Sequence, residues 1–281
     1  MQVKKILQAY GIKPRKKMGQ NFLVSYKYLN KIVESAHLCA EDWVIEIGAG
    51  IGNLTELFLP KTSRVIAVEQ DERLVNILIH RLGSNPKLEV LKGDFLKVKI
   101  EEFCSPRLKI IGNPPYYFTS KLVEKLIYEQ KYFNSAFLSF QKEYVERMVA
   151  NPGGKQYGRL SIFVQSFFNC QILFKIPKTA FYPQPEVDSI FISLIPKKDI
   201  NVDVEKLGII TQEFFSSRRK KISTIIKNSE RLNSWNMEKV LDKVGIDVDL
   251  RPEIISVEKY IEIANALRKK EKEKEYVSRT F

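Results

Sequence analysis

The chain has 281 residues, of which 44% are hydrophobic and 28% charged, a globular composition that excludes wholesale disorder and allows one large domain or one large and one small domain. No apolar run approaches the ~18 residues of a membrane span and the N-terminus lacks a signal-peptide core, so we expect a cytoplasmic protein without membrane association. The 46 Lys and Arg residues against 33 Asp and Glu give a net charge of +13, which fits either a polyanionic partner or a basic but otherwise ordinary enzyme.

Short apolar runs alternate with longer amphipathic stretches through the first two thirds of the chain. One such stretch, 71–82, carries leucines at helical spacing and is followed by Gly83. Apolar strands that alternate with helices form a parallel sheet with helices on both faces. We therefore expect an α/β fold with strands at 43–47, 64–68, 88–91, 108–111 and 137–140.

Two later runs, 171–176 and 188–195, have no helical pattern between them. The connecting segment contains Pro183 and Pro185 and is too short for the crossover that parallel strands need, so we expect an antiparallel pair. A mostly parallel sheet with one antiparallel strand is the arrangement of Rossmann-like class I methyltransferases. We expect this sheet domain to span residues 1–196.

The composition changes after Pro196, where the strand signals stop. Helical patterns follow at 203–216, 217–229, 236–244 and 256–268. The last of these has one apolar face, and Ser256 is its expected N-cap. We expect a small all-helical domain over residues 197–281, which ends in a charged tail.

The turn after the first expected strand contains three closely spaced glycines, in the run Gly48-Ala49-Gly50-Ile51-Gly52. Glycines allow a tight strand-to-helix turn and let the backbone come close to a ligand. Dinucleotide sites carry G-x-G-x-x-G there, with a helix N-terminus aimed at the pyrophosphate. Here Asn53 takes the place of the third glycine, a spacing that fits a cofactor without a pyrophosphate better.

Three acidic residues lie near the expected carboxyl ends of strands, where open α/β sheets bind ligands. Glu69 is placed to accept from two ribose hydroxyls, and Asp94 from an adenine amino group. Glu46, beside the glycines, is placed to balance an ammonium group. Each alone could be a cap or a solvated strand end, but together they favour S-adenosylmethionine over NAD as the cofactor.

The loop Asn113-Pro114-Pro115-Tyr116 follows the fourth expected strand. Two prolines keep its backbone extended. If the side-chain carbonyl of Asn113 and the backbone carbonyl of Pro114 accept the two hydrogens of an amino group, its nitrogen becomes tetrahedral and can attack a methyl donor. Tyr116 offers a face for a base. Such loops act on DNA adenine, cytosine N4, RNA adenine and protein glutamine, so the loop fixes the reaction type alone.

The cysteines do not indicate a disulfide framework or a zinc site. Cys39, Cys104 and Cys170 are far apart and odd in number. His37 lies close to Cys39, but no second pair of ligands accompanies them. We expect no metal.

Several further motifs resemble those of the ribosomal RNA adenine N6,N6-dimethyltransferase family, which includes the small-subunit dimethylase and the erythromycin-resistance methylases. Near the N-terminus, residues 16–23 resemble its G-Q-N-F-L signature, and residues 181–189 resemble its F-x-P-x-P-x-V-x-S segment. In the helical region, residues 214–221 and 250–256 are similar to the small-subunit (16S) dimethyladenosine transferase branch. These matches extend over nearly the whole chain, from about residue 10 to 268.

The resemblance implies particular roles for residues that match the family motifs. It places S-adenosylmethionine against Asn21, Leu23, Gly48, Glu69, Asp94 and Asn113. It makes Asn113, Pro114 and Tyr116 the catalytic loop and Phe181 a second aromatic wall against the target base. It also implies dimethylation of two adjacent adenines near the 3′ end of 16S ribosomal RNA, within an immature 30S subunit, by a monomeric enzyme.

Pro114 departs from the family pattern, which usually has leucine or isoleucine at this position. N-P-P-Y is more typical of DNA amino-methylases. Because the backbone carbonyl is the group that acts, proline is expected to serve.

Three other functions remain open at this point. One is adenine N6 methylation of large-subunit rRNA or DNA, and another is a mainly non-catalytic role in ribosome assembly or nucleic-acid binding. A protein-glutamine methylase is a third, although it leaves the basic helical region unexplained. Two basic clusters are candidates for RNA contacts or are merely solvated: Lys13, Arg15, Lys16 and Lys17, and Arg218, Arg219, Lys220 and Lys221.

Overall fold

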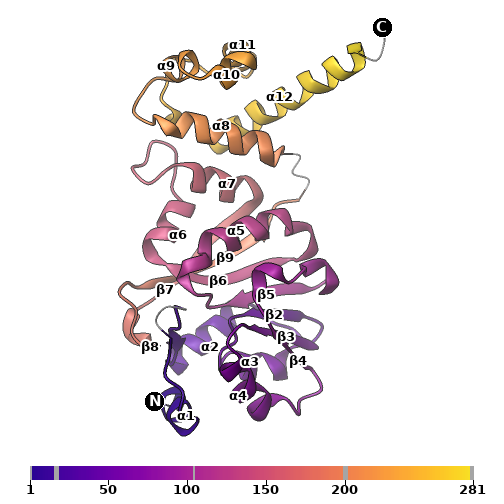
Figure 1. Ribbon diagram of the computed structural model, residues 1–281, viewed down its shortest axis with the longest axis vertical. Coiled ribbons are helices and arrows are strands. Elements are labelled where there is room, and N and C mark those ends of the chain that lie inside the picture. The colour runs from indigo at the N-terminus through magenta and orange to yellow at the C-terminus, as the bar shows by residue number, and fades with distance from the viewer. Residues whose placement is uncertain (1, 16–18, 104, 199–201, 279–281) are drawn as a thin grey trace. The chain divides into compact units, whose positions relative to one another are not determined.

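The computed structural model describes residues 2–15, 19–103, 105–198 and 202–278. The chain forms two compact units, whose elements are labelled in Figure 1. The first unit contains Met1–Val145 and Asn169–Pro196, and the second contains Glu146–Phe168 and Lys197–Phe281. The chain therefore passes between the units at Pro196, where we expected a boundary, and also on both sides of residues 146–168, which belong to the second unit.

A seven-stranded sheet with the order β4-β3-β2-β5-β6-β9-β7 forms the centre of the first unit. Four strand pairs are parallel (β2 with β3, β2 with β5, β3 with β4, β5 with β6), and β9 runs antiparallel to β6. The strands of this sheet are β2 (Trp43–Ile47), β3 (Arg64–Glu69), β4 (Leu88–Lys92), β5 (Leu108–Gly112), β6 (Ser135–Gln141), β7 (Phe168–Ile176) and β9 (Ser189–Pro196).

The predicted α/β fold with a mostly parallel sheet is confirmed. The strands fall within a few residues of the predicted ranges, because central strands buried on both faces are continuous apolar runs. A second sheet, of two short strands, was not predicted: β1 (Phe22–Leu23) pairs antiparallel with β8 (Phe181–Tyr182). These strands are too short to produce an alternating pattern.

Helices surround the main sheet (Figure 1). Asp71 caps the longest of them between β3 and β4, because its side chain accepts a hydrogen bond from the Arg73 N–H at 3.2 Å. The helices are α1 (Gln2–Ala9), α2 (Tyr26–Ser35), α3 (Thr55–Phe58), α4 (Glu72–Leu82) and α5 (Thr119–Tyr128), and α6 (Lys142–Met148) follows β6.

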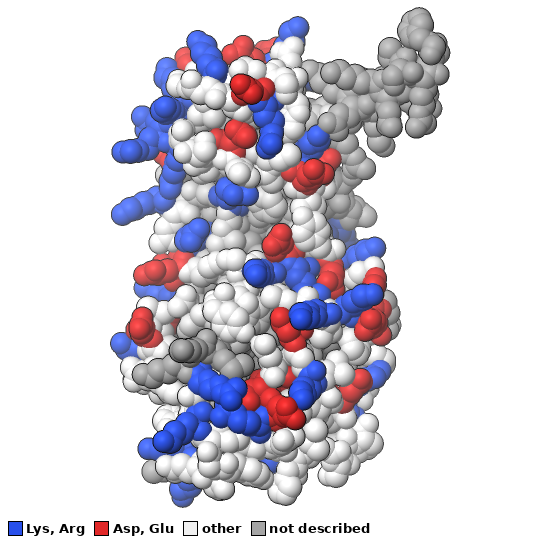
Figure 2. Space-filling model, in the orientation of Figure 1, with Lys and Arg blue, Asp and Glu red and all other residues white. Residues whose placement is uncertain are grey.

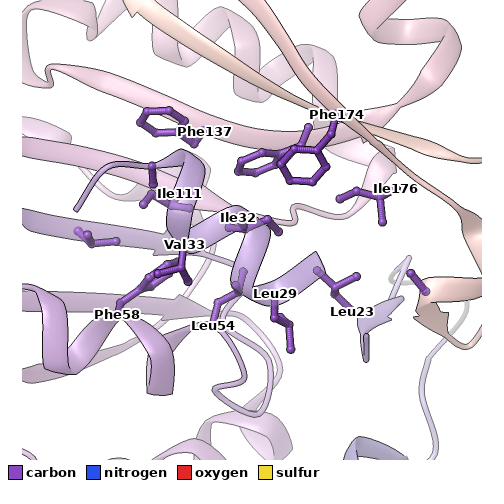
Figure 3. Close-up of a cluster of buried hydrophobic side chains, with 14 of the residues drawn as sticks. Leu23, Leu29, Ile32, Val33, Leu54, Phe58, Ile111, Phe137, Phe174 and Ile176 are labelled. Carbon is purple, nitrogen blue, oxygen red and sulfur yellow. The ribbon is translucent and has the colours of Figure 1, made fainter. Parts of the chain in front are cut away.

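A hydrophobic cluster joins α2 and α3 to one face of the sheet (Figure 3). Side chains on this face of neighbouring strands, such as Ile111 of β5 and Phe137 of β6, pack with Ile32 of α2 and Phe58 of α3. Leu23 of β1 belongs to the same cluster. Burial of this apolar surface stabilises the packing of the helices on the sheet. Through Leu23 it also holds residues 19–23, which we call the N-terminal segment, against the sheet.

The second unit consists mainly of helices. Tyr157 and Tyr260 are fully buried in it, and each phenol donates a hydrogen bond to a backbone carbonyl, of Ile255 and Pro252 respectively. Ser256 accepts from the Lys259 N–H at 3.3 Å, as expected of an N-cap. The helices are α7 (Arg159–Phe167), α8 (Val204–Ser216), α9 (Ile222–Lys227), α10 (Glu230–Ser234), α11 (Met237–Lys243) and α12 (Val257–Ser278).

Among the described residues, no helix is both long enough and apolar enough to span a bilayer. These residues also contain no group of three or more His, Cys, Asp or Glu side chains arranged to hold a metal ion.

Candidate functional site

The order of strands in the main sheet reverses between β2 and β5. The sheet continues from β2 to β3 and β4 on one side, and from β5 to β6 on the other. Open α/β sheets bind ligands at the carboxyl ends of strands where such a reversal occurs. Ile47 lies opposite Gly112, so the segments that begin with Gly48 and Asn113 leave the sheet side by side.

A pocket of about 890 Å³, including the part open to solvent, lies at this point of the sheet. The N-terminal segment, the glycine loop and residues at the ends of β3, β4 and β5 form its walls. All six residues that we expected around the cofactor line this one pocket: Asn21, Leu23, Gly48, Glu69, Asp94 and Asn113.

All three glycines of the loop have backbone conformations that other residues rarely adopt. Gly48 has φ +70°, Gly50 has φ +58° and Gly52 has φ +89°. A Cβ atom on Gly50 would lie 3.2 Å from the ring of Phe22, and the Gly50 N–H donates to Glu69 Oε2 over 2.8 Å. Glycine therefore lets the loop pass close to the N-terminal segment while a hydrogen bond holds it to the end of β3.

Glu69 is the last residue of β3 and is largely buried. Its Oε2 accepts from Gly50, and its Oε1 accepts from the Asp71 N–H at 2.9 Å. Burial raises the pKa of this carboxyl group, and the backbone donors act in the opposite direction. Each carboxylate oxygen has a second lone pair, so Glu69 keeps acceptor capacity for a ligand.

Glu46 lines the same pocket and is buried in β2. Its Oε2 accepts from the Thr55 hydroxyl at 2.5 Å. Burial, together with the charge of Glu69, raises the pKa of Glu46 to about 8. The carboxyl group is therefore mostly protonated at neutral pH in the protein alone, and a cation beside it would favour the ionised form.

Asp94 follows β4, where it caps a short helix and also lines the pocket. Its Oδ1 accepts from the Leu96 N–H at 2.9 Å and so caps the short helix η3 (Phe95–Lys97). Asp94 also lines the pocket next to Phe95, which is buried. The capping interpretation and the ligand interpretation of the sequence are therefore compatible, because the cap occupies one lone pair of one oxygen.

Side chains from two other segments hold the N-terminal segment against the pocket. Gln20 Nε2 donates to Asp71 Oδ2 over 2.9 Å, and Asn53 Nδ2 donates to the Leu23 carbonyl over 3.2 Å. Asn53 is the residue that stands in place of a third glycine in the loop. It contributes a hydrogen bond there that glycine lacks.

The side-chain amide of Asn113 is held at both ends. Its Nδ2 donates to the Asn21 carbonyl over 3.0 Å, and its Oδ1 accepts from the Ser139 hydroxyl. The neighbouring Pro114 is buried. The amide oxygen has two lone pairs, so one remains after the bond from Ser139.

Tyr116 and Tyr117 differ in exposure and in their contacts. Tyr116 is partly buried and hydrogen-bonds through its phenol to Ser189 Oγ at 2.7 Å. Tyr117 is 62% exposed, donates to Gln70 Oε1 over 3.2 Å and lines the pocket, which Tyr116 does not. Sequence reasoning did not single out Tyr117, although it directly follows the Asn113-Pro114-Pro115-Tyr116 loop.

Phe181 is not among the residues that line the pocket. It is 4% exposed and packs in the hydrophobic cluster of α2, where β8 pairs with β1 and places it opposite Leu23. The role of this ring as an aromatic wall against the target base stays a prediction. Strand pairing buries it, and the pocket's exposed aromatic ring belongs to Tyr117.

The basic cluster 218–221 divides into two parts. Arg218 is tied into the second unit: its guanidinium donates to Glu253 Oε2 and to the carbonyls of Gly154 and Lys155, the last two over 3.0 and 2.7 Å. These bonds join three segments of the unit. Arg218 therefore has a structural role that its sequence context did not reveal.

The other three members of this cluster are exposed. Arg219 and Lys220 are solvent-facing, and Lys221 lies 3.3 Å from Asp249 in an exposed ion pair. Lys and Arg side chains gather along one edge of the second unit, around α9 and its connection to α8 (Figures 1 and 2). This edge is a basic surface to which the exposed residues 219–221 belong.

The N-terminal basic cluster is only partly described. Lys13 and Arg15 are exposed, and Arg15 lies 3.9 Å from the buried carboxylate of Asp71. Lys16 and Lys17 lie outside the described residues.

Comparison with known sequences identifies relatives along nearly the whole chain. The family model for ribosomal RNA adenine dimethylase matches residues 11–269. The ribosomal RNA small subunit methyltransferase A of Clostridium perfringens is 38% identical over 274 residues, which is 96% of each chain. The protein of the same name from Alkaliphilus oremlandii is 37% identical over 276 residues, 95% of this chain and 96% of its own.

Solved structures show the same similarity. A dimethyladenosine transferase from Plasmodium falciparum superposes with a TM-score of 0.78 and 29% identity, over 89% of this chain and 98% of its own. The 23S rRNA methyltransferase ErmE, 23% identical, shares the fold with a TM-score of 0.67 over 88% of this chain and 100% of its own. Together with the family match, these relatives show that the chain belongs to the ribosomal RNA adenine dimethylase family.

Proposed function

We propose that this enzyme transfers methyl groups from S-adenosylmethionine to N6 of two adjacent adenines near the 3′ end of 16S rRNA, in an immature 30S subunit. One observation carries the chemistry: the side-chain oxygen of Asn113 is fixed at the edge of a pocket that has the acidic residues expected for this cofactor. Family membership supports ribosomal RNA as the substrate class, and the small subunit methyltransferases of Clostridium perfringens and Alkaliphilus oremlandii support the small subunit.

The residues of the pocket fit S-adenosylmethionine. Glu69 and Asp94 retain carboxylate lone pairs for ribose hydroxyls and an adenine amine, and Glu46 gives a counter-charge for an ammonium group. A dinucleotide pyrophosphate beside Glu46 would keep that buried carboxyl group protonated, whereas the ammonium group of S-adenosylmethionine would favour its ionised form. A side chain at position 50 would press on the ring of Phe22, which lines the same pocket.

The catalytic loop acts on the amino group of adenine, whose lone pair is delocalised into the ring. The free lone pair of Asn113 Oδ1 accepts one N6 hydrogen, and the carbonyl of Pro114 accepts the other. These bonds orient the nitrogen and draw it toward tetrahedral geometry. The bound cofactor supplies an electrophilic methyl group on a sulfonium.

The aromatic residues of the loop receive the base. Stacking of an extruded base on an aromatic face contributes ~1–3 kcal/mol per base. Tyr116 is anchored by Ser189 and so presents a fixed edge, while Tyr117 is exposed at the pocket. Pro114 replaces the family's usual leucine or isoleucine without loss of the carbonyl that we assign to catalysis.

The basic edge of the second unit is proposed to bind rRNA phosphates, through Arg219, Lys220 and Lys221. Lysine and arginine gain affinity there because counterions leave the RNA. We propose that the enzyme acts as a monomer in the cytoplasm, where small subunits assemble.

Mapping of the methylated nucleotides tests the function. Isotope-labelled S-adenosylmethionine is incubated with the enzyme and with unmethylated 30S particles, naked 23S rRNA or double-stranded DNA, and labelled nucleosides are located by mass spectrometry. We expect two adjacent N6,N6-dimethyladenosines near the 3′ end of 16S rRNA. Preferential labelling of 23S rRNA or DNA would assign the enzyme to that substrate instead.

Replacement of Asn113 tests the mechanism. Asn113→Ala removes the acceptor for the N6 hydrogen, and we expect the methylation rate to fall by at least about 100-fold, as for loss of a fixed transition-state donor or acceptor. Thermal unfolding and calorimetric titration with cofactor serve as controls for folding and for cofactor binding. A variant that retains wild-type activity would refute the role of Asn113.

A further inference from the structure

The register of β5 and β6 places a hydroxyl group next to the catalytic loop. Ile111 of β5 lies opposite Phe137 of β6, and both belong to the hydrophobic cluster on one face of the sheet. Side chains alternate between the two faces of a sheet, so the residues two positions later lie on the same face. These are Asn113, at the start of the loop, and Ser139.

Ser139 is completely buried, with an exposed fraction of 0%. Its neighbours in β6, Leu138 and Phe140, are apolar, and Phe191 lies opposite it on β9. The hydroxyl donates to Asn113 Oδ1, so a buried polar group that would be unfavourable alone is satisfied by the catalytic amide.

The two hydrogen bonds of the amide define its orientation. The Asn21 carbonyl can only accept, so it selects the Nδ2 end of the amide, and a donor is needed at the Oδ1 end. Ser139 is the donor there. A rotated amide would present N–H groups to the target amine, where an acceptor is required. The Asn21 carbonyl opposes that rotation because it would then face Oδ1, and the Ser139 hydroxyl, which can donate or accept, fixes the position of the amide end that it contacts.

We propose that Ser139 is a positioning residue for methyl transfer, which holds the Asn113 side chain with its oxygen toward the target amine. This inference rests on the proposed role of Asn113. Ser139 itself is not among the residues that line the pocket. Its contribution is to keep one lone pair of Oδ1 directed at the place where the amino group must bind.

The test compares two buried serines of the same sheet. Ser139→Ala removes the hydroxyl at the amide. Ser193→Ala is the matched control, because Ser193 is 3% exposed and lies on β9 opposite Phe137. Strand β6 separates β9 from β5, the strand that leads into the loop. Steady-state methylation is measured with the RNA on which the wild-type enzyme is active, so the result does not depend on which rRNA that is.

We expect kcat of the Ser139→Ala variant to fall about 10- to 100-fold, as for misplacement of a reacting group by about 1 Å, with KM for RNA changed less than about twofold. Ser193→Ala should keep kcat within about twofold of wild type. Both variants should lose a similar few degrees of thermal stability. The loss of kcat is then specific to the hydroxyl at Asn113.

A double-mutant cycle identifies the route of the effect. If Ser139 acts through Asn113, the variant that carries both Ser139→Ala and Asn113→Ala is as slow as Asn113→Ala alone. Additive losses of rate would overturn the proposal. So would wild-type kcat in Ser139→Ala, or an equal loss of kcat in Ser193→Ala. Absence of 16S methylation by the wild-type enzyme would instead contradict the proposed substrate and leave this comparison intact.

Discussion

Glu46 is a carboxylic acid that the central sheet removes from water. Its neighbours are the Thr55 hydroxyl and the like charge of Glu69, and burial is the largest cause of its pKa of about 8. Such a group lowers the free energy of unfolding at every pH at which it would be ionised in the unfolded chain. The position of Glu46 in the pocket suggests that this cost serves ligand binding.

The pH dependence of stability follows from this raised pKa. Between pH 4.5, the ordinary pKa of glutamate, and about pH 8 the unfolded chain has lost the Glu46 proton and the folded protein has kept it. The free energy of unfolding therefore falls as pH rises through this window, by about 1.4 kcal/mol per unit of pKa difference. Glu46→Gln should remove this contribution and exceed wild-type stability at pH 8.

Urea denaturation between pH 4 and pH 8 measures this difference. The exposed Glu124 on α5 provides the control, since Glu124→Gln should leave the pH dependence unchanged. Parallel curves for wild type and Glu46→Gln would contradict the buried carboxyl as the source. In the presence of cofactor the ammonium group is expected to lower the pKa of Glu46, so wild-type cofactor affinity should rise with pH over the same window.

Residue roles were predicted from sequence only where a motif signalled them. Glu69, Asp94 and Asn113 stand at strand ends, and the expected positions of those ends were enough to bring them together in one pocket. Ser139 lies inside an apolar strand, where a small polar residue has no distinctive pattern, and the motif that ends at Ser189 does not indicate a contact with Tyr116. Their bonds to the catalytic loop depend on strand register, which the sequence does not display.

Strands β2 and β5 approach closely where the two loops of the site leave the sheet. A Cβ atom on Gly112 would lie 2.4 Å from the carbonyl oxygen of Ile47, a backbone atom that cannot move without its strand. The glycine therefore sets the separation of β2 and β5, and through it the distance between the glycine loop and Asn113. The distance between the two loops of the site therefore depends on how β2 and β5 pack against each other.

Substitution of this glycine tests the close packing. Gly112→Ala should destabilise the protein by about 1–3 kcal/mol, because an inserted methyl group forces the backbone apart. Gly93 is a matched control at the end of β4: a Cβ atom there would meet no atom within 4 Å, so Gly93→Ala should change stability by no more than about 0.5 kcal/mol. Equal unfolding midpoints in urea for the two variants would contradict the packing argument.

Elements were predicted well where burial made them uniform. The central strands and the amphipathic helix α4 follow their apolar patterns closely. The helix expected over 217–229 is shorter, as α9, and α10 follows it as a separate helix capped by Ser229. Five-residue helices and two-residue strands such as β1 are too short for a hydrophobic pattern to repeat, so their packing partners determine them.

The second unit contains two kinds of basic residue, which differ in their surroundings. Arg218 has an acidic partner and two backbone carbonyls, whereas Arg219 and Lys220 face solvent. Within one cluster, Arg218 therefore stabilises the fold, whereas the adjacent Arg219 and Lys220 are available for the proposed RNA binding.

Variants at these positions should give opposite results in two assays. Arg218→Ala should destabilise the protein by about 1–3 kcal/mol, because Glu253 and two carbonyls would be left without their donor. The double variant Arg219→Glu, Lys220→Glu should keep wild-type stability and bind 30S particles more weakly. The slope of its log affinity against log salt should fall by about 0.7–0.9 for each RNA phosphate that the variant no longer neutralises. An unchanged salt slope would exclude these residues from RNA binding.

The organisation of the whole chain was only partly visible in the sequence. The change of composition after Pro196 marks a real passage between units, since the sheet ends there. Residues 146–168 continue the alternating α/β pattern in the sequence, yet they belong to the second unit. The reason is that α7 packs against α8 and α12, which are remote in sequence, and no local pattern encodes that choice.

The second unit consists of two separate segments of the chain, 146–168 and 197–281. A single crossover point in the sequence therefore cannot replace this unit by that of a relative. A protein cut after Pro196 would keep α7 without α8 and α12, so the apolar face of α7 would be exposed. Recombination between relatives would have to transfer an internal segment and the C-terminal segment together to give a well-packed hybrid. The proposed RNA-binding surface can thus be exchanged only together with residues 146–168, which interrupt the unit that carries the proposed methyl-transfer site.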